Sequence, residues 1–405
     1  MDSSRYLENL KAIECRDSTP WFEPALVYGS AVGSKVYSVE GASYIDLCAG
    51  FGTLPLGHNH PAFKKTLQSV LDQNLVTQAL GDLYPSKSKV DFMETLIAFL
   101  PSKFTTAALS LSGAQAIEFA MKTAMYSTSR DEFVVFDSGY HGLDLGSLSL
   151  TRGDFFRKPF ESWLNSSKVK VFPYGVMSHE LSQCLKSKTV AAVVCEPIQG
   201  RGGMREGSAD WLRELYHETK QSGSLLIFDE VFTGVGRAGE TVLAAKDECD
   251  ILCVGKAIGG GMPLSACVSS REIMSAWPES DGEARHTGTF FGHGLSTAVG
   301  EATLKTVIQE NLIHRSANLG SEIIDYLKVH LGQKSSVKEI RGRGLMLAIE
   351  GTEPFYGVKL MNQLRKVGVI AIPCGSQGRS LALTPALNIP KVELYEALDK
   401  IISLA

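Results

Sequence analysis

Two charged residues in the middle of the chain each follow a short apolar run, and together they are suited to chemistry on a carbonyl compound. The apolar run 225–228 leads to Asp229, and the run 251–254 ends two residues before Lys256, which lies among glycines. Such runs are typical of strands buried on both faces of a parallel sheet. Because ligands of these sheets bind at the carboxyl ends of the strands, we expect both side chains to face one site.

A lysine and a carboxylate in this setting are what pyridoxal phosphate requires. The amine can hold the cofactor aldehyde as a Schiff base, and the carboxylate can keep the pyridine nitrogen protonated. Taken singly, Asp229 is explained more simply as a helix cap and Lys256 as a surface charge in a glycine loop. Their joint setting instead predicts a pyridoxal-phosphate-dependent enzyme with Lys256 and Asp229 as the catalytic residues.

The segments around these residues resemble the signature of a known family. DEVFTGVGRAG begins at Asp229, GKAIGGGMP begins at Gly255, and matching features recur from about residue 29 to 385. They are similar to the class III aminotransferases, the ornithine, acetylornithine, 4-aminobutyrate and omega-amino acid group of fold type I. The resemblance implies a transferase that moves an amino group between an amine or amino acid, with omega-amino donors expected, and a keto acid or aldehyde.

A phosphate site is expected at the start of the helix in LSLSGAQAIEFAMKTA. Ser112 and Gln115 have the spacing of a capping box, which marks the first turn of a helix. Free backbone N–H groups at a helix N-terminus favour an anion. Most serine-capped helices bind nothing, but in the resembling family Ser112, Gly113 and Ala114 match the segment that holds the cofactor phosphate.

The resemblance implies further site residues. Tyr140 matches the aromatic residue that stacks on the pyridine ring, while His141 is expected to support its loop. Glu196, in EPIQGRGG, is expected near the cofactor or substrate, and Phe51 or Gly52 is expected to border the substrate pocket. Thr289 matches the residue that reaches the phosphate of the other subunit, which implies a homodimer with shared sites.

Three positions depart from the family pattern. Arg201 replaces a glutamate of the ornithine-type enzymes, and Ala382 replaces the arginine that pairs with that glutamate. A paired loss is reasonable because a lone buried charge would cost several kcal/mol. We expect Arg201 or Arg379 to bind the substrate carboxylate instead. Phe232 replaces a glutamine that donates a hydrogen bond near the cofactor's phenolic oxygen.

Composition limits the other possibilities. The net charge of −4 provides no basic surface for nucleic acid or membrane, and no apolar segment is long enough to span a bilayer. The N-terminal segment lacks a signal-peptide core, so a cytosolic protein is expected. The eight cysteines are scattered and are expected to be reduced, and the histidines, including His58 and His60, show no metal-binding pattern.

The expected fold is α/β, with a mostly parallel central sheet flanked by helices and a smaller α+β domain built from both termini. Strands are expected near residues 107, 133, 169, 190, 224, 250 and 264, and a hairpin at 36–47. Helices are expected at 5–14, 298–312, 317–331, 358–367 and 391–404, and 153–173 is expected to be a surface excursion. The expected domains are 1–50, the N-terminal part of the small domain; 51–300, the large cofactor domain; and 301–405, the C-terminal small domain.

Four other functions compete with simple amino transfer. A glutamate semialdehyde aminomutase or a decarboxylating aminotransferase would use the same cofactor, and sequence does not show which substrate bond is held perpendicular to the ring. A non-enzymatic ligand-binding relative is expected to lack the lysine or the aspartate. A nicotinamide-dependent oxidoreductase is disfavoured because no GxGxxG follows an early strand.

Overall fold

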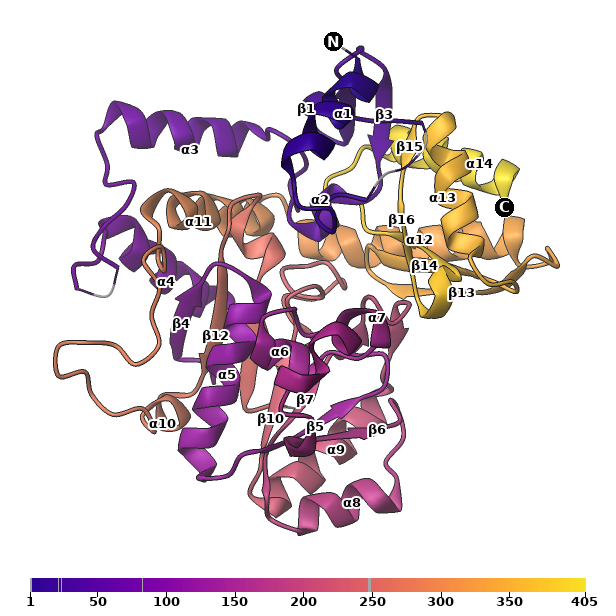
Figure 1. The fold of residues 1–405 in the computed structure, drawn as a ribbon. Coiled ribbons are helices and arrows are strands. Elements are labelled where there is room, and N and C mark those ends of the chain that lie inside the picture. Colours follow the sequence, from indigo (N-terminus) through magenta and orange to yellow (C-terminus); the bar gives the residue numbers. More distant parts are fainter. Residues whose placement is uncertain (1, 21, 23, 82, 247–248) are drawn as a thin grey trace.

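The chain folds into two lobes that share one boundary (Figure 1). The structure is a computed structural model and describes residues 2–20, 22, 24–81, 83–246 and 249–405. The larger lobe surrounds a seven-stranded sheet, and the smaller lobe contains both ends of the chain (Figure 1). The α/β architecture expected from the sequence is confirmed, including the smaller lobe assembled from both termini.

The central sheet has the strand order β4-β12-β11-β10-β7-β5-β6. Its strands are β4 (Thr106–Ser110), β5 (Glu132–Phe136), β6 (Val169–Phe172), β7 (Val190–Cys195), β10 (Leu225–Asp229), β11 (Ile251–Val254) and β12 (Ser265–Ser269). Neighbours are parallel except at β12, which is antiparallel to both β4 and β11. All seven expected strands are confirmed, and the sheet is mostly parallel.

Helices cover both faces of this sheet, as the apolar strands require. Ile227 packs on the face covered by α5 (Gly113–Thr128) and α10 (Arg271–Met274). Its neighbours Leu226 and Phe228 point to the opposite face. The helices packed on that face are α4 (Lys87–Phe99), α8 (His179–Lys186), α9 (Ala209–Ser222) and α11 (Gly294–Gln309). Burial on two faces explains why these strands lack polar alternation.

The smaller lobe joins residues from opposite ends of the chain. The expected hairpin is confirmed, with β2 (Lys35–Ser38) antiparallel to β3 (Ser43–Asp46). Strand β1 (Tyr28–Val32), which was not predicted, pairs with β2 and is mostly exposed. On its other side β3 pairs in parallel with the C-terminal strand β15 (Val369–Ile370).

The C-terminal part forms a second antiparallel sheet packed against helices. The sheet consists of β13 (Val337–Arg343), β14 (Met346–Gly351), β17 (Ser380–Leu383) and β16 (Ile372–Cys374), and the helices are α12 (Leu312–Leu331), α13 (Tyr356–Lys366) and α14 (Lys391–Leu404). The expected helix at 391–404 has the observed bounds. The expectation for α12 was wrong at its start, because the helix begins five residues earlier, after Asn311 adopts a left-handed conformation.

The remaining elements are short or lie at the periphery. They are α1 (Ser3–Ile13), α2 (Ala49–Gly52), α3 (Pro61–Asp72), α6 (Leu145–Leu150), α7 (Asp154–Arg157), β8 (Ile198–Gln199), β9 (Arg205–Glu206) and the 3₁₀ helices η1 (Lys158–Trp163), η2 (Ser166–Lys168), η3 (Leu243–Lys246), η4 (Lys256–Gly259) and η5 (Ser376–Gly378). The expected irregular excursion at 153–173 is therefore only partly correct, since it contains α7, η1, η2 and β6.

The buried guanidinium of Arg237 joins the two lobes. It donates hydrogen bonds to the carbonyl oxygens of Leu345, in the turn between β13 and β14, and of Pro385, after β17. The Arg237 carbonyl in turn accepts from the Leu345 N–H at 2.9 Å and from the Ser316 hydroxyl of α12. The loop that follows β10 is thus fixed to the smaller lobe by both its backbone and its side chain.

The fully buried carboxyl group of Glu230 ties the start of the loop after β10 to its later residues. It accepts hydrogen bonds from the N–H groups of Leu243 and Ala244 at 2.8 and 2.7 Å, and from the Thr233 hydroxyl. Burial raises the pKa of Glu230 to about 7, although these three hydrogen bonds oppose the rise. The group is therefore more readily protonated in the folded protein than in the unfolded chain.

This difference predicts a pH-dependent stability. The tighter binding of a proton by Glu230 in the folded state stabilises the protein fully below the ordinary pKa of 4.5. This stabilisation is lost as the pH rises through about 7. The Glu230→Gln variant cannot ionise, so its free energy of unfolding relative to wild type should increase by on the order of 2 kcal/mol between about pH 5 and pH 8. Urea denaturation across that range measures the difference. The matched change at the exposed carboxylate, Glu283→Gln, should leave it constant; a constant difference for Glu230→Gln would contradict the prediction.

Candidate active site

The carboxyl ends of adjacent strands bring Asp229 and Lys256 to one cavity. Asp229 ends β10 opposite Cys253 of the parallel strand β11, and Lys256 follows β11 by two residues. The cavity has a volume of about 480 Å³. It is lined by eleven of the residues singled out in the sequence: Phe51, Ser112, Gly113, Ala114, Tyr140, His141, Glu196, Arg201, Asp229, Phe232 and Lys256. Residues from six separate parts of the chain therefore converge at one sheet edge.

Lys256 has an unusual backbone and a largely apolar setting. Its φ of 44° lies in the left-handed region, which is rarely used by residues with a side chain and is found at functional sites. The Nζ atom lies 4.5 Å from the centre of the Phe232 ring. Burial lowers the pKa of Lys256, and the opposing influence of the Asp229 and Glu196 carboxylates does not cancel this effect. The amine therefore loses its proton more easily than an exposed lysine does.

Asp229 is buried and held by two partners. Its Oδ1 atom accepts from the Val231 N–H at 3.2 Å, and its Oδ2 atom lies 2.9 Å from Nδ1 of His141. The imidazole is itself buried, and the Thr151 hydroxyl accepts a hydrogen bond from the His141 backbone N–H. Sequence reasoning gave His141 only a loop-supporting role and missed this contact, although its position next to Tyr140 in SGYHG was a usable signal.

Glu196 supports two loops that border the cavity. Its carboxylate accepts from the N–H of Tyr140 at 2.9 Å and from the N–H of Gly200 at 3.1 Å. Burial raises the pKa of Glu196 to about 7; nearby His141 opposes the rise and Asp229 adds to it. The side chain thus fixes the backbone beside the aromatic ring of Tyr140.

The N-terminus of α5 provides free N–H groups at the cavity. Ser112 caps the helix by accepting from the Gln115 N–H, and the Gln115 side chain accepts from the Leu111 N–H rather than from that of the cap residue. Within the part of the chain that the structure describes, the N–H groups of Gly113 and Ala114 have no acceptor. A Cβ atom on Gly113 would lie 2.7 Å from the Val231 side chain. Because Gly113 has no side chain, it can pack closely against Val231 while its N–H group stays accessible to an anion.

These groups fit pyridoxal phosphate. The cavity offers an amine of lowered pKa for the aldehyde, a buried carboxylate for a protonated ring nitrogen, an aromatic side chain and unpaired N–H groups for a phosphate. The sequence singled out each of these groups, whereas it missed Val231, Leu143 and Asp144, which also line the cavity. Val231 follows Asp229 by two residues on the same turn, which was the available signal.

Arg201 is exposed at the edge of the cavity between two aromatic rings. Its guanidinium carbon lies 5.2 Å from the centre of the Tyr140 ring and 5.1 Å from that of Phe156. Such contacts orient a cation without neutralising it. Among the described residues, no carboxylate forms an ion pair with Arg201, so its charge is available to a ligand.

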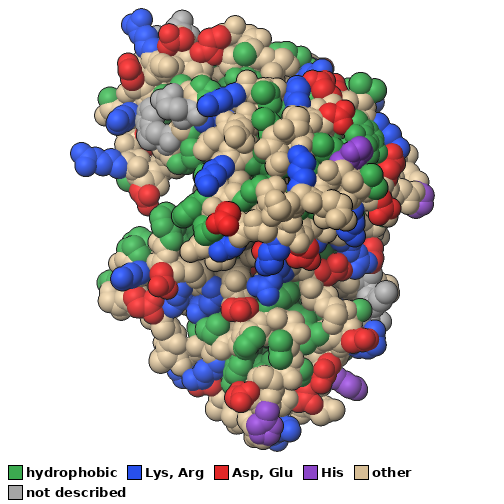
Figure 2. Space-filling model, turned by 90° about the vertical axis from the view of Figure 1, so that its right-hand side faces the viewer, with side chains coloured by type: hydrophobic (Ala, Val, Ile, Leu, Met, Phe, Trp, Pro, Cys, Tyr) green, Lys and Arg blue, Asp and Glu red, His purple; other side chains and the backbone are tan. Residues whose placement is uncertain are grey.

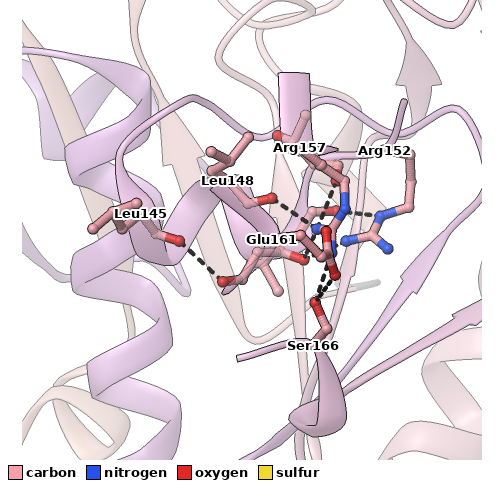
Figure 3. A network of polar contacts seen from close by, with 9 residues as sticks. Leu145, Leu148, Arg152, Arg157, Glu161 and Ser166 are labelled. Carbon is pink, nitrogen blue, oxygen red and sulfur yellow. Dashed lines mark hydrogen bonds and ion pairs between the residues drawn. The ribbon is translucent and has the colours of Figure 1, made fainter. Parts of the chain in front are cut away.

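The segment that carries Phe156 is anchored by a buried arginine (Figure 3). Arg157 donates to the carbonyl oxygens of Leu148 and Ser149 at 3.0 and 2.8 Å, and to the Ser166 hydroxyl at 2.8 Å. Glu161 accepts from both Arg157 and Ser166. This network fixes α7 and η1 beside the cavity, and with them the aromatic surface against which Arg201 rests.

Two marked residues lie outside the cavity. Thr289 is exposed, and its carbonyl oxygen accepts from the Gln78 side chain at 2.5 Å. Arg379 donates to the Thr352 carbonyl and lines a second cavity of about 810 Å³ near the boundary of the lobes. Figure 2 shows Lys and Arg side chains among carboxylates along the boundary of the lobes. Within one chain, only Arg201 of the two candidate arginines lines the cavity with Lys256.

The cysteines, His58 and His60 have ordinary structural environments. All eight cysteines are free thiols. His58 lies 2.8 Å from an Asp46 oxygen, and His60 accepts from the Ala62 N–H. In the described ranges no cluster of ligands could hold a metal ion. None of the helices described there is long and apolar enough to cross a membrane.

Comparison with known proteins gives consistent results. The model of the family described as aminotransferase class-III matches residues 19–404. An acetylornithine aminotransferase of Methanosarcina acetivorans is 33% identical over 376 residues, which cover 92% of this chain and 90% of that protein. A diaminobutyrate–2-oxoglutarate aminotransferase of Rhizobium meliloti is 33% identical, covering 90% of this chain and 84% of its own length.

The fold is similar to that of solved aminotransferases. An ornithine aminotransferase from Toxoplasma gondii, whose structure has partial PLP occupancy at the active site, superposes with a TM-score of 0.89. The two chains are 25% identical, and the match covers 99% of this chain and 93% of the other.

Proposed function

This chain belongs to the class III aminotransferases, which are pyridoxal-phosphate-dependent enzymes, and we propose that Lys256 carries the cofactor in the cavity described above. One observation supports the assignment most strongly: Asp229 and Lys256 end neighbouring strands and share a cavity with the free N–H groups of α5. Ser112, Gly113 and Ala114 would hold the phosphate, and Tyr140 the ring face. Glu196 would maintain the backbone that positions Tyr140.

The proposed chemistry assigns a separate task to each charged group. Bound pyridoxal phosphate supplies an aldehyde that links to amines and a ring that withdraws electrons from the bond being broken. Asp229, which accepts from the Val231 N–H and contacts His141, would hold the proton on the ring nitrogen. Lys256, with a pKa lowered by burial, would take the proton from the substrate carbon through its free Nζ atom.

We propose an omega-amino compound as donor and a keto acid as acceptor. The relatives named above support this, since they are acetylornithine and diaminobutyrate aminotransferases. Their transaminase activity also favours amino transfer over the mutase and decarboxylase reactions. The cavity wall is mostly aromatic and apolar, and Arg201 is its one guanidinium among the described residues. We therefore assign the substrate carboxylate to Arg201.

We further propose a cytosolic homodimer. The free thiols are compatible with a reducing compartment. Exposed apolar side chains gather where the segment 76–84 meets the loop of Thr289, through the Gln78 bond and the approach of Gly81. They are Val76, Leu80, Leu83, Tyr84 and Phe290, each more than half exposed. A second copy of the chain would cover this patch and bring Thr289 to its site.

Sedimentation equilibrium tests the dimer. The protein should sediment as a species with twice the monomer mass of 43.8 kDa, because dimer formation removes the exposed apolar patch from water. The Phe290→Glu variant, which puts a charge into this patch, should shift the equilibrium towards monomer by at least tenfold. A Val392→Glu variant, which puts the same charge on a still more exposed position of α14, is the control and should remain dimeric. A monomeric wild-type chain would refute the proposal.

Lys256→Ala should abolish transamination. Without the ε-amino group the enzyme cannot form the covalent link to the aldehyde, so the visible absorbance of the lysine-bound cofactor should be missing after incubation with pyridoxal phosphate. Adding an amino donor should bleach that absorbance in wild type and release a free carbonyl product. The matched variant Lys186→Ala, at an exposed lysine of α8, should behave as wild type. Full activity of Lys256→Ala would exclude this lysine.

The Arg201→Ala variant should bind substrates that carry a carboxylate more weakly. Loss of one charge-assisted interaction predicts an increase in KM of about 10- to 100-fold for keto acids. Donors without a carboxylate should be unaffected, because the guanidinium would contact no other part of them. Steady-state kinetics with paired donors measures the contrast. Arg379→Ala is the comparison variant and should change neither KM; the opposite result would assign the carboxylate to Arg379.

A further inference from the structure

The Phe232 ring is held in a slot between two glycines. A Cβ atom on Gly200 would lie 2.5 Å from Cδ1 of Phe232, and one on Gly52 would lie 2.8 Å from Cε2 on the opposite edge. Neither glycine can gain a side chain while the ring stays in place. The two close approaches therefore fix the plane of the ring and present one of its faces to the cavity.

That face is directed at the catalytic amine. The Nζ atom of Lys256 lies 4.5 Å from the ring centre, within the range of a cation–π contact. In the described ranges Nζ forms neither a hydrogen bond nor an ion pair. The other charged groups that act on it are Asp229 from β10, Glu196 from the end of β7 and Arg201 from the loop after β8. Among the described residues, the Phe232 ring is the group that favours the ammonium form of Lys256 by direct contact.

We propose that Phe232 is a positioning residue whose ring face stabilises the ammonium form of Lys256 whenever that amine is free. This inference rests on the proposed role of Lys256 in the reaction. It goes beyond that role because it assigns the proton affinity of the amine to a residue that carries no charge and donates no hydrogen bond. Gly200 and Gly52 belong to the same device, since they allow the ring to present its face.

The direction of the effect follows from the charge distribution of the ring. The negative face of an aromatic ring attracts an ammonium group but not a neutral amine. An aliphatic side chain of similar volume would keep Lys256 equally buried without this attraction. Removing the ring should therefore lower the pKa of Lys256, and the amine should become neutral at a lower pH.

Competitive acetylation of the full-length, cofactor-free chain measures this pKa directly. Acetic anhydride modifies only neutral amines, and mass spectrometry of the Lys256 peptide gives the midpoint of its labelling against pH. In Phe232→Leu the midpoint should fall by about 0.5 to 1 pH unit. In a chain with 4-fluorophenylalanine at this position, which retains the shape but weakens the ring face, it should fall by less. Gly200→Ala should also lower it, because the new Cβ displaces the ring.

The control is Phe51→Leu, which removes another aromatic side chain of the same cavity and should leave the midpoint unchanged. An unchanged or raised midpoint in Phe232→Leu would overturn the proposal, as would a fluorinated ring that titrates like phenylalanine while leucine lowers the midpoint. Because labelling requires no cofactor, the result does not depend on whether Lys256 forms the covalent link. In the active enzyme, the acid limb of the pH profile of kcat should shift with the midpoint.

Discussion

Burial of the Asp229 carboxylate at the end of β10 is the constraint on which the site depends. A buried charge is costly unless hydrogen bonds and nearby charges compensate for it. Here the compensation comes from the Val231 N–H and from His141, which is in turn held by Thr151. The same strand end positions Glu230, whose carboxyl group closes the loop on the other side. One strand thus supplies both the chemical group and the support of the surrounding loop.

Much of this arrangement could be predicted from the sequence because its signals are local. Apolar runs identified every strand of the central sheet, and Ser112 with Gln115 marked the start of α5. The contact of His141 with Asp229 joins residues 88 positions apart, and no local pattern encodes it. Arg379 illustrates the same limit: it is only three residues from Ala382 in sequence, but it lies just before strand β17 and lines a different cavity.

The environment of Arg201 shows how one substitution changes the means of recognition. In the resembling enzymes a glutamate and an arginine can neutralise each other, whereas this chain has Arg201 and Ala382 at those positions. Ala382 is buried in β17, where a charged side chain would lack a partner. Aromatic rings now orient the arginine without consuming its charge. This arrangement depends on the position of the segment 150–168, which the hydrogen bonds of Arg157 hold in place.

The bonds of Arg237 oppose a separation of the two lobes. Separating the lobes along their shared boundary would strip the guanidinium of two carbonyl partners and expose the seam around Leu345. Because water would reach the exposed groups, the net cost is on the order of 1 kcal/mol for each hydrogen bond lost, in addition to the exposure of the apolar side chain of Leu345. These bonds favour the closed arrangement of the lobes, in which Phe51, Leu143 and Arg201 line the cavity that leads to Lys256.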